Sequence, residues 1–256
     1  MLALVRPVSP RLADCELMEM ERAPIDAARA MRQHEAYVAS LGRLGARIEY
    51  LPPLPEHADG VFVEDTAVVL PELAVITRPG AASRQAEVQS TATALTQHRP
   101  LQRIVAPGTL DGGDVLRVGR SLYVGLSART NREGVKQLEQ ALAPHGYGVR
   151  ALPLQGCLHL KSAVTFLPPD RLLINPDWID PAVFPRLHSV EVDPDEPSAA
   201  NTLTLAGTTL VSTRYPRTAE KLRSLGISVW PTEVDELHKA QAGLTCMSLI
   251  LEPRGA

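Results

Sequence analysis

The chain has 256 residues, of which 45% are apolar and 21% are charged, and its formal net charge is −3. These values are typical of a globular protein that buries its own core, and the length allows one large domain or two small ones. The sequence contains no block of like charges and no apolar run of membrane-spanning length. We therefore expect neither nucleic acid nor a membrane as a partner.

The cysteines are few and lie far apart in the sequence, at positions 15, 157 and 246. Such spacing is neither a disulfide framework nor a structural zinc motif. It is typical of a reducing compartment, and the N-terminal segment lacks the apolar stretch of a signal peptide. The sequence therefore predicts a cytoplasmic protein without a bound metal.

Four segments of the chain share the order strand, strand, helix, strand. In residues 61–106 the strands are VFVEDTAVVL, LAVITRPG and LQRIVAP, and the helix follows Ser83 as its N-cap. The same order is predicted for residues 111–154, 159–193 and 201–233. In the second of these, Gly119-Arg120 is expected to form a hairpin turn of type II′.

The two ends of the chain together predict a fifth unit. Residues 1–53 contain a strand in LALVRPVS, a helix over 25–44 and a strand in RIEYLPP, and residues 244–256 add the strand CMSLILEP. Five such units in one domain would form a five-bladed α/β propeller, closed by the N- and C-terminal strands and without open edges. The alternative is an ordinary α/β domain with mixed sheets.

Polar or reactive residues begin the first strand of each predicted unit. In a ring, these equivalent positions would face one axis and form one site. The residues are Glu64 and Asp65, Asp111 and Asp114, His159, Asn201, and Cys246.

This set fits a cysteine hydrolase. A thiolate is a good nucleophile, a histidine can protonate a leaving amine, and a carboxylate can orient that histidine. Further carboxylates would attract a cation, and a planar guanidinium pairs well with them. Arg84 and Arg129 follow strand ends and would bind a substrate carboxylate. The expected substrate therefore carries a guanidinium at one end and an amino-acid head at the other.

Each residue alone also has a purely structural interpretation. Cys246 is compatible with a small core residue, and His159 with a buried histidine that has no chemical role. Arg84 and Arg129 are compatible with ordinary surface charges. Catalysis is favoured only because these residues occur together and at equivalent positions of the repeated units.

Motifs along the chain resemble those of dimethylarginine dimethylaminohydrolase, a family of guanidine-modifying enzymes with the pentein fold. The matching segments lie between positions 31 and 248 and are MRQHEAYVASLG, VFVEDTAVV, ITRPGAASR, TLDGGDVLRVG, LYVGLSARTNREG, LHLKS and LTCMS. The resemblance implies hydrolysis of N-methylated arginine to citrulline without a cofactor. An arginine deiminase, an amidinotransferase and a non-catalytic propeller that binds a ligand remain alternatives, and the protein is expected to be a monomer or a homodimer.

The resemblance also assigns roles to individual residues. It makes Cys246 the nucleophile, His159 the general acid and base, and Asp111 the carboxylate that orients His159. The residues that the resemblance assigns to substrate binding are Asp65 and Glu64 with Asp59 nearby for the guanidinium, Arg84 and Arg129 for the carboxylate, and Leu17 in a lid.

Overall fold

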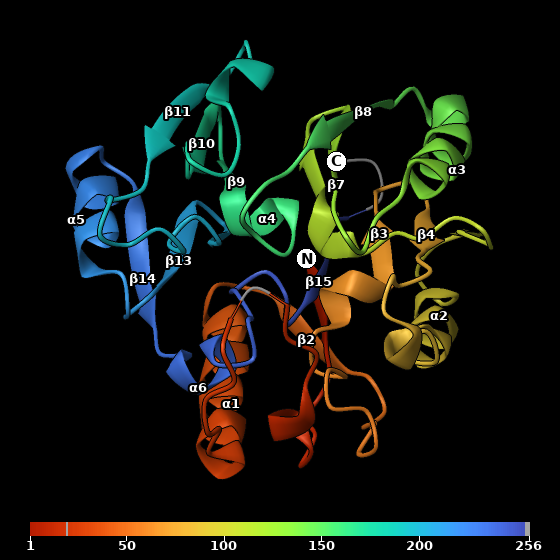
Figure 1. The fold of residues 1–256 in the computed structure, drawn as a ribbon, viewed down its shortest axis with the longest axis horizontal. Helices are drawn as coiled ribbons and strands as arrows, with labels where there is room; N and C mark the ends of the chain where they lie inside the picture. Colours follow the sequence, from red (N-terminus) through yellow and green to blue (C-terminus); the bar gives the residue numbers. More distant parts are fainter. Residues whose placement is uncertain (19, 254–256) are drawn as a thin grey trace.

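The computed structural model describes residues 1–18 and 20–253. Its strands form five sheets of three strands each, placed around one axis, with the longer helices on the outside (Figure 1). This arrangement confirms the predicted five-bladed α/β propeller. None of the described helices is long and apolar enough to cross a membrane.

Every sheet has the same internal plan. The strand that begins each unit pairs antiparallel with the middle strand, and the middle strand pairs parallel with the last one, after a helical connection. The sheets of the first two complete units are β3 (Ala67–Val69), β4 (Ala74–Ile76) and β5 (Leu101–Arg103), then β6 (Val115–Val118), β7 (Ser121–Leu126) and β8 (Gly148–Pro153). The next two are β9 (Val164–Leu167), β10 (Arg171–Ile174) and β11 (His188–Glu191), then β12 (Leu203–Leu205), β13 (Thr208–Ser212) and β14 (Ser228–Thr232).

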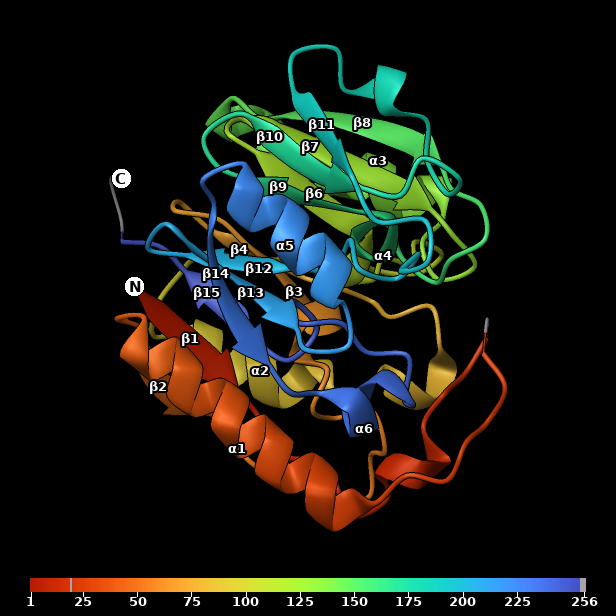
Figure 2. The ribbon, with the colours of Figure 1, turned by 90° about the vertical axis from the view of Figure 1, so that its left-hand side faces the viewer.

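The two ends of the chain build the fifth sheet. Strand β1 (Leu2–Val5) lies in its middle, antiparallel to β15 (Leu249–Leu251) and parallel to β2 (Arg47–Tyr50). All four residues of β1 are buried, as expected for a strand covered on both faces. Helix α1 (Ala27–Arg43) lies along this sheet (Figure 2). The prediction that strands from both termini close the ring is therefore confirmed.

The helices follow their sequence signals closely where a polar side chain caps them. Asn131 accepts the amide N–H of Gly134 and begins α3 (Arg132–Leu142), whose buried residues Val135, Leu138 and Leu142 follow helical spacing. Asp26 caps α1 in the same way. The remaining α-helices are α2 (Val88–Leu95), α4 (Leu160–Ala163), α5 (Pro216–Ser224) and α6 (Asp235–His238).

Several local predictions were wrong, among them one helix cap and the starts of some first strands, such as that of Cys246, which precedes β15. Ser83 does not cap a helix, because its hydroxyl donates to Glu16 and α2 begins only at Val88. Residues Val63–Thr66, predicted as strand, form one of several short 3₁₀ helices. Successive side chains of a 3₁₀ helix leave in directions about 120° apart, so Glu64 and Asp65 point to different places. The other 3₁₀ helices are Leu12–Asp14, Ala82–Arg84, Gly112–Asp114, Ala143–His145 and Pro181–Val183.

Candidate active site

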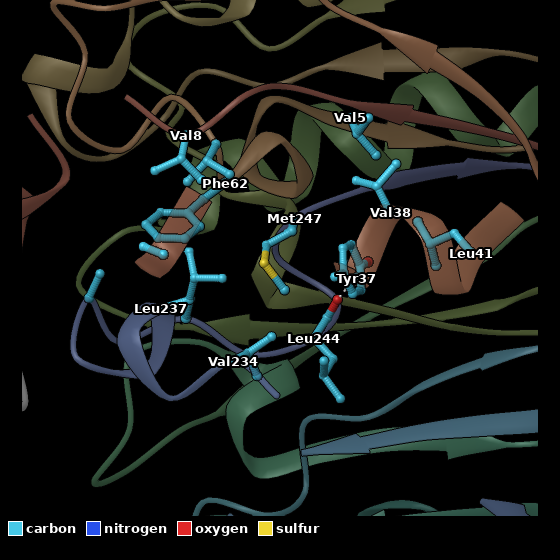
Figure 3. Packing of buried hydrophobic residues seen from close by; sticks show 14 of the residues in the cluster. Val5, Val8, Tyr37, Val38, Leu41, Phe62, Val234, Leu237, Leu244 and Met247 are labelled. Atoms are coloured by element: carbon cyan, nitrogen blue, oxygen red, sulfur yellow. Dashed lines mark hydrogen bonds between the residues drawn. The ribbon is translucent and has the colours of Figure 1, made fainter. Parts of the chain in front are cut away.

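Cys246 lies in the loop between α6 and β15, and its neighbours anchor this loop in the core. Met247 and Leu244 are fully buried and pack near Tyr37 of α1 (Figure 3). The Tyr37 hydroxyl lies 2.9 Å from the Leu244 carbonyl, to which it donates. The Cys246 sulfur accepts the amide N–H of Gly243 at 3.2 Å. Because core packing and hydrogen bonds hold both sides of the loop, the thiol has a defined position.

The environment of Cys246 favours the neutral thiol. Burial raises the pKa of Cys246 well above its ordinary value, and the charges of Glu64 and Asp65 raise it further. Lys161 and the Gly243 amide act in the opposite direction but more weakly. Formation of the nucleophilic thiolate therefore requires an additional positive charge near the sulfur.

His159 begins α4 and is nearly fully buried among carboxylates. Its Nε2 lies 3.1 Å from an Asp111 oxygen, and its Nδ1 lies 3.9 Å from an Asp65 oxygen. Burial by itself lowers the pKa of His159, but the nearby carboxylates Asp65, Asp114 and Asp111 outweigh it and raise the pKa to about 9. The imidazole is therefore cationic at neutral pH and can act as a proton donor.

Cys246 and His159 line one small cavity of about 20 Å³. Its other lining residues include four of the predicted binding residues and several from neighbouring loops. These residues are Asp59, Asp65, Phe62, Arg84 and Arg129, with Glu16, Leu158, Ala240, Gln241 and Ala242. The repeat thus brings together residues that lie up to 230 positions apart along the chain, 16 and 246 being the outermost. A volume near that of one water molecule means that the walls must move to admit a larger ligand.

Asp65 and Arg84 form a buried ion pair at one side of the cavity. Nη1 of Arg84 lies 2.6 Å from Oδ2 of Asp65, and Oδ1 accepts the Gly113 amide. Burial opposes ionisation of Asp65, but His159 and Arg84 lower its pKa to about 2. The Asp65 carboxylate is therefore charged and already has two protein donors.

Arg84 is largely committed to protein groups. Its Nε and Nη2 donate to Glu87, and Nη2 also donates to the Phe62 carbonyl at 2.9 Å. The structure thus places Arg84 in the cavity wall, where most of its donors hold the wall together.

Arg129 differs from Arg84 because it pairs with no carboxylate among the described residues. It is 6% exposed and lines the same cavity, and its Nε approaches the Met18 sulfur at 3.2 Å. A thioether is only a weak acceptor. A buried guanidinium whose partner is so weak can bind an anionic ligand by donating hydrogen bonds to it.

An N-terminal segment covers the cavity. Asp59 accepts the Glu16 amide N–H at 3.1 Å, and Gln241 accepts the Met18 amide N–H at 3.1 Å. Burial raises the pKa of Asp59 to about 6. Leu17, between the two contacts, packs against the apolar core cluster instead of lining the cavity. Hydrogen bonds of Glu16 and Met18 thus join this segment to residues of the cavity lining.

Glu64 faces another cavity. Its carboxylate lies 2.6 Å from Lys161 Nζ and 2.6 Å from the Thr245 hydroxyl. These residues line a hollow of about 360 Å³ between the first strands of all five sheets, and no described residue lines both cavities. The structure therefore does not place Glu64 beside the other predicted guanidinium ligands. Its backbone N–H donates to the Cys246 carbonyl at 3.0 Å, so Glu64 supports the cysteine loop.

One group of potential metal ligands lies within the cavity wall. Ligand atoms of Asp65, Asp111 and His159 lie within 4.8 Å of one another. Hydrogen bonds and the ion pair with Arg84 account for this cluster, because each carboxylate already has protein donors.

Sequence reasoning assigned no individual role to three residues that the structure ties to the site. Asp114 was recognised as part of LDGGDV but received no role, although it contacts the loops of His159 and Arg129. Lys161 stands two residues after His159, and Gln241, with a φ of 61°, accepts the Met18 amide N–H. The LHLKS motif offered a signal for Lys161, whereas nothing in the sequence marked Gln241.

Comparison with known proteins finds relatives among the guanidine-modifying enzymes. The family model of arginine deiminase matches residues 25–195. A dimethylarginine dimethylaminohydrolase of Streptomyces coelicolor is 41% identical over 97% of this chain and 96% of its own length. The enzyme of the same name from Pseudomonas aeruginosa is 36% identical over 88% of this chain and 89% of its own length.

Solved structures agree with this result. A cysteine-to-serine mutant of the Pseudomonas aeruginosa enzyme in complex with citrulline superposes with a TM-score of 0.92, at 34% identity over 96% of this chain and 97% of the other. The N-terminal domain of the cyanobacterial arginine dihydrolase ArgZ, at 20% identity and a TM-score of 0.84, shares the fold. The chain belongs to the arginine deiminase family and, within the pentein superfamily, to the dimethylarginine dimethylaminohydrolases.

Proposed function

We propose that this protein hydrolyses Nω-methylated arginine to citrulline and an alkylamine through a covalent intermediate on Cys246. One observation carries the proposal: the thiol of Cys246, the carboxylate-paired imidazole of His159 and the guanidinium of Arg129, which pairs with no described carboxylate, line the same cavity. The relatives named above and the citrulline complex of one of them support the same reaction.

Substrate charge would activate the nucleophile. The guanidinium enters beside Asp65 and Cys246, and its positive charge stabilises the thiolate that burial disfavours. Asp59 and Asp65 attract the cation, and Arg129 binds the substrate carboxylate at the other end. Arg84 holds Asp65 in place and retains one Nη1 hydrogen for a further acceptor.

The chemical steps then use one acid–base residue twice. The Cys246 sulfur attacks the guanidinium carbon, and the bond to the dimethylamino nitrogen breaks as His159 protonates that nitrogen. The neutral His159 takes a proton from water, whose oxygen attacks the thiouronium carbon. The carbon–sulfur bond breaks and restores the thiolate, the added oxygen loses its remaining proton to form the citrulline carbonyl, and the released dimethylamine takes up that proton in solution. Asp111 keeps the imidazole oriented throughout, because it lies 3.1 Å from Nε2.

Citrulline release from asymmetric dimethylarginine, arginine and agmatine tests the proposal. We expect the methylated substrate to react best, and agmatine to react poorly because it lacks the carboxylate for Arg129. C246S should abolish release, whereas C157S, at a cysteine outside the cavity lining, should retain it. Activity that survives in C246S would refute the nucleophile, and a preference for arginine would identify a deiminase. The cytoplasmic location and the monomeric or homodimeric state remain predictions.

A further inference from the structure

Asp114 carries a fully buried carboxylate that the reaction described above does not use. Its Oδ1 accepts the Leu160 amide N–H at 3.0 Å, and its Oδ2 accepts the hydroxyls of Ser127 and Thr130, both at 2.6 Å. It forms no ion pair with any described residue. A buried carboxylate with neutral donors is costly, so its presence calls for a reason beyond packing.

Each donor to Asp114 lies within two residues of a residue of the candidate active site. Leu160 follows His159, and Ser127 and Thr130 flank the segment that contains Arg129. Both hydroxyls also accept a backbone N–H from the loops of the site. The Ser127 oxygen accepts the Arg129 amide at 3.0 Å, and the Thr130 oxygen accepts the Asp111 amide at 3.1 Å.

Two glycines allow close packing around this carboxylate. A Cβ atom on Gly125 would lie 3.0 Å from the Asp114 oxygen and 3.0 Å from the Leu160 side chain. A Cβ atom on Gly113, one residue before Asp114, would lie 2.7 Å from Nδ1 of His159. Asp114 therefore lies within a turn that touches the imidazole directly and is packed closely on both sides.

We propose that Asp114 is a positioning residue that holds the His159 loop and the Arg129 loop in register with each other. The inference rests on the proposed function, since it assigns the acid–base group and the carboxylate-binding group to one reaction. The alternative is a buried carboxylate that contributes only to stability.

The first test is D114N, which preserves size but replaces an acceptor with a donor toward two hydroxyls. We expect kcat for dimethylarginine to fall and KM to rise, so that kcat/KM falls by about 10- to 100-fold. Losses of this size are typical when a residue that orients a metal ligand is replaced in other proteins. Loss of the charge should also lower the pKa of His159, which NMR of the labelled imidazole measures. A lower melting temperature with unchanged kcat, KM and His159 titration would overturn the inference.

A matched pair of milder variants covers the case in which D114N does not fold. T130V keeps the shape of Thr130 but removes its hydroxyl, whereas T130S keeps the hydroxyl. We expect T130V to lower kcat/KM and T130S to restore it. S127A should act mainly on KM, since Ser127 supports the Arg129 amide. Equal activity of T130V and the wild type would contradict the inference.

The two proposals can fail separately. If the wild-type protein releases no citrulline from any of the three substrates, the proposed function fails, and the His159 titration in D114N still tests the positioning role. If the wild type is active and D114N and T130V match it in kcat, KM and His159 titration, only the positioning role fails.

Discussion

Nη1 of Arg84 lies 2.6 Å from Oδ2 of Asp65, and both side chains are about 5% exposed. Two residues expected to bind opposite ends of a substrate thus bind each other in the wall of the cavity. The second carboxylate on Arg84, that of Glu87, lies at 2.9 Å and is even more deeply buried. Arg84 therefore compensates two buried negative charges, and its loss would affect the fold before it affected binding.

Replacing Arg84 with Met should destabilise the protein strongly. Two buried carboxylates would lose their cation, and breaking a buried pair in this way costs about 3–5 kcal/mol. Urea unfolding monitored by circular dichroism measures the free energy of unfolding. R84K, which keeps the charge but not the fork of donors, should lie between R84M and the wild type. An unchanged unfolding midpoint in R84M would show that the pair does not stabilise the fold.

Replacing Arg129 with Met should weaken substrate binding more than it lowers the stability of the fold. Arg129 pairs with no described carboxylate, so its loss should change the free energy of unfolding by less than the loss of Arg84 does. KM for dimethylarginine should rise about 10- to 100-fold, because a hydrogen bond to a charged group contributes about 1.5–3 kcal/mol.

Dimethylagmatine provides the control for R129M, because it lacks the carboxylate. Its kcat/KM should be nearly the same in R129M and in the wild type. If R129M lowered kcat/KM equally for both substrates, Arg129 would not act through the substrate carboxylate, and the carboxylate-binding role would be contradicted.

The ring could be predicted from sequence because each unit repeats one order of strands and one helix. Strand patterns and caps such as Asn131 carry local information, and the split fifth unit followed from the unmatched strands at both ends. The register of the repeat predicted that Cys246, His159 and Asp111 converge, and in the structure Cys246 and His159 line one cavity while Asp111 lies 3.1 Å from His159.

The directions of neighbouring side chains could not be predicted in the same way. Glu64 and Asp65 are adjacent, yet one binds Lys161 in the large axial hollow and the other binds Arg84 beside His159. A strand would also separate them, but only the observed 3₁₀ turn determines where each one points. The spacing of Arg84 and Glu87, three residues apart, was a signal for their ion pair.

The charges around Cys246 predict how fast its thiol reacts with iodoacetamide. Burial first, and then Glu64 and Asp65, raise the pKa of the thiol, so alkylation at neutral pH should be slow and should accelerate as pH rises. E64Q removes a negative charge and should accelerate alkylation at fixed pH about three- to tenfold, whereas K161M should slow it.

Peptide mass spectrometry measures this reaction at each cysteine separately. Cys15 and Cys157 serve as internal references, because neither lies in the cavity of Cys246. Changes of the same sign in E64Q and K161M, at equal folded fractions, would show that the ion pair does not act on the thiol through charge.

His34 predicts a specific loss of stability in acid. Burial in α1 lowers the pKa of His34 to about 4, below the ordinary value of about 6.5, and its Nε2 has no hydrogen-bond partner among the described residues. Since the folded-state pKa is the lower one, the contribution of His34 is complete above about pH 6.5 and is lost as pH falls toward 4. By pH 5 the loss should reach about 2 kcal/mol.

H34L should remove this loss and leave the protein as stable as the wild type at neutral pH, because it replaces an unpaired buried nitrogen with carbon. Asp59 and Asp114, whose pKa values are raised to about 6, act with the opposite sign in the same window. They act equally in both proteins, so the difference between H34L and the wild type isolates His34. The free energy of unfolding in urea between pH 7 and pH 4.5 measures this difference, with H145L at an exposed site as the control. Parallel curves for H34L and the wild type would mean that His34 is not a buried neutral group whose protonation destabilises the fold.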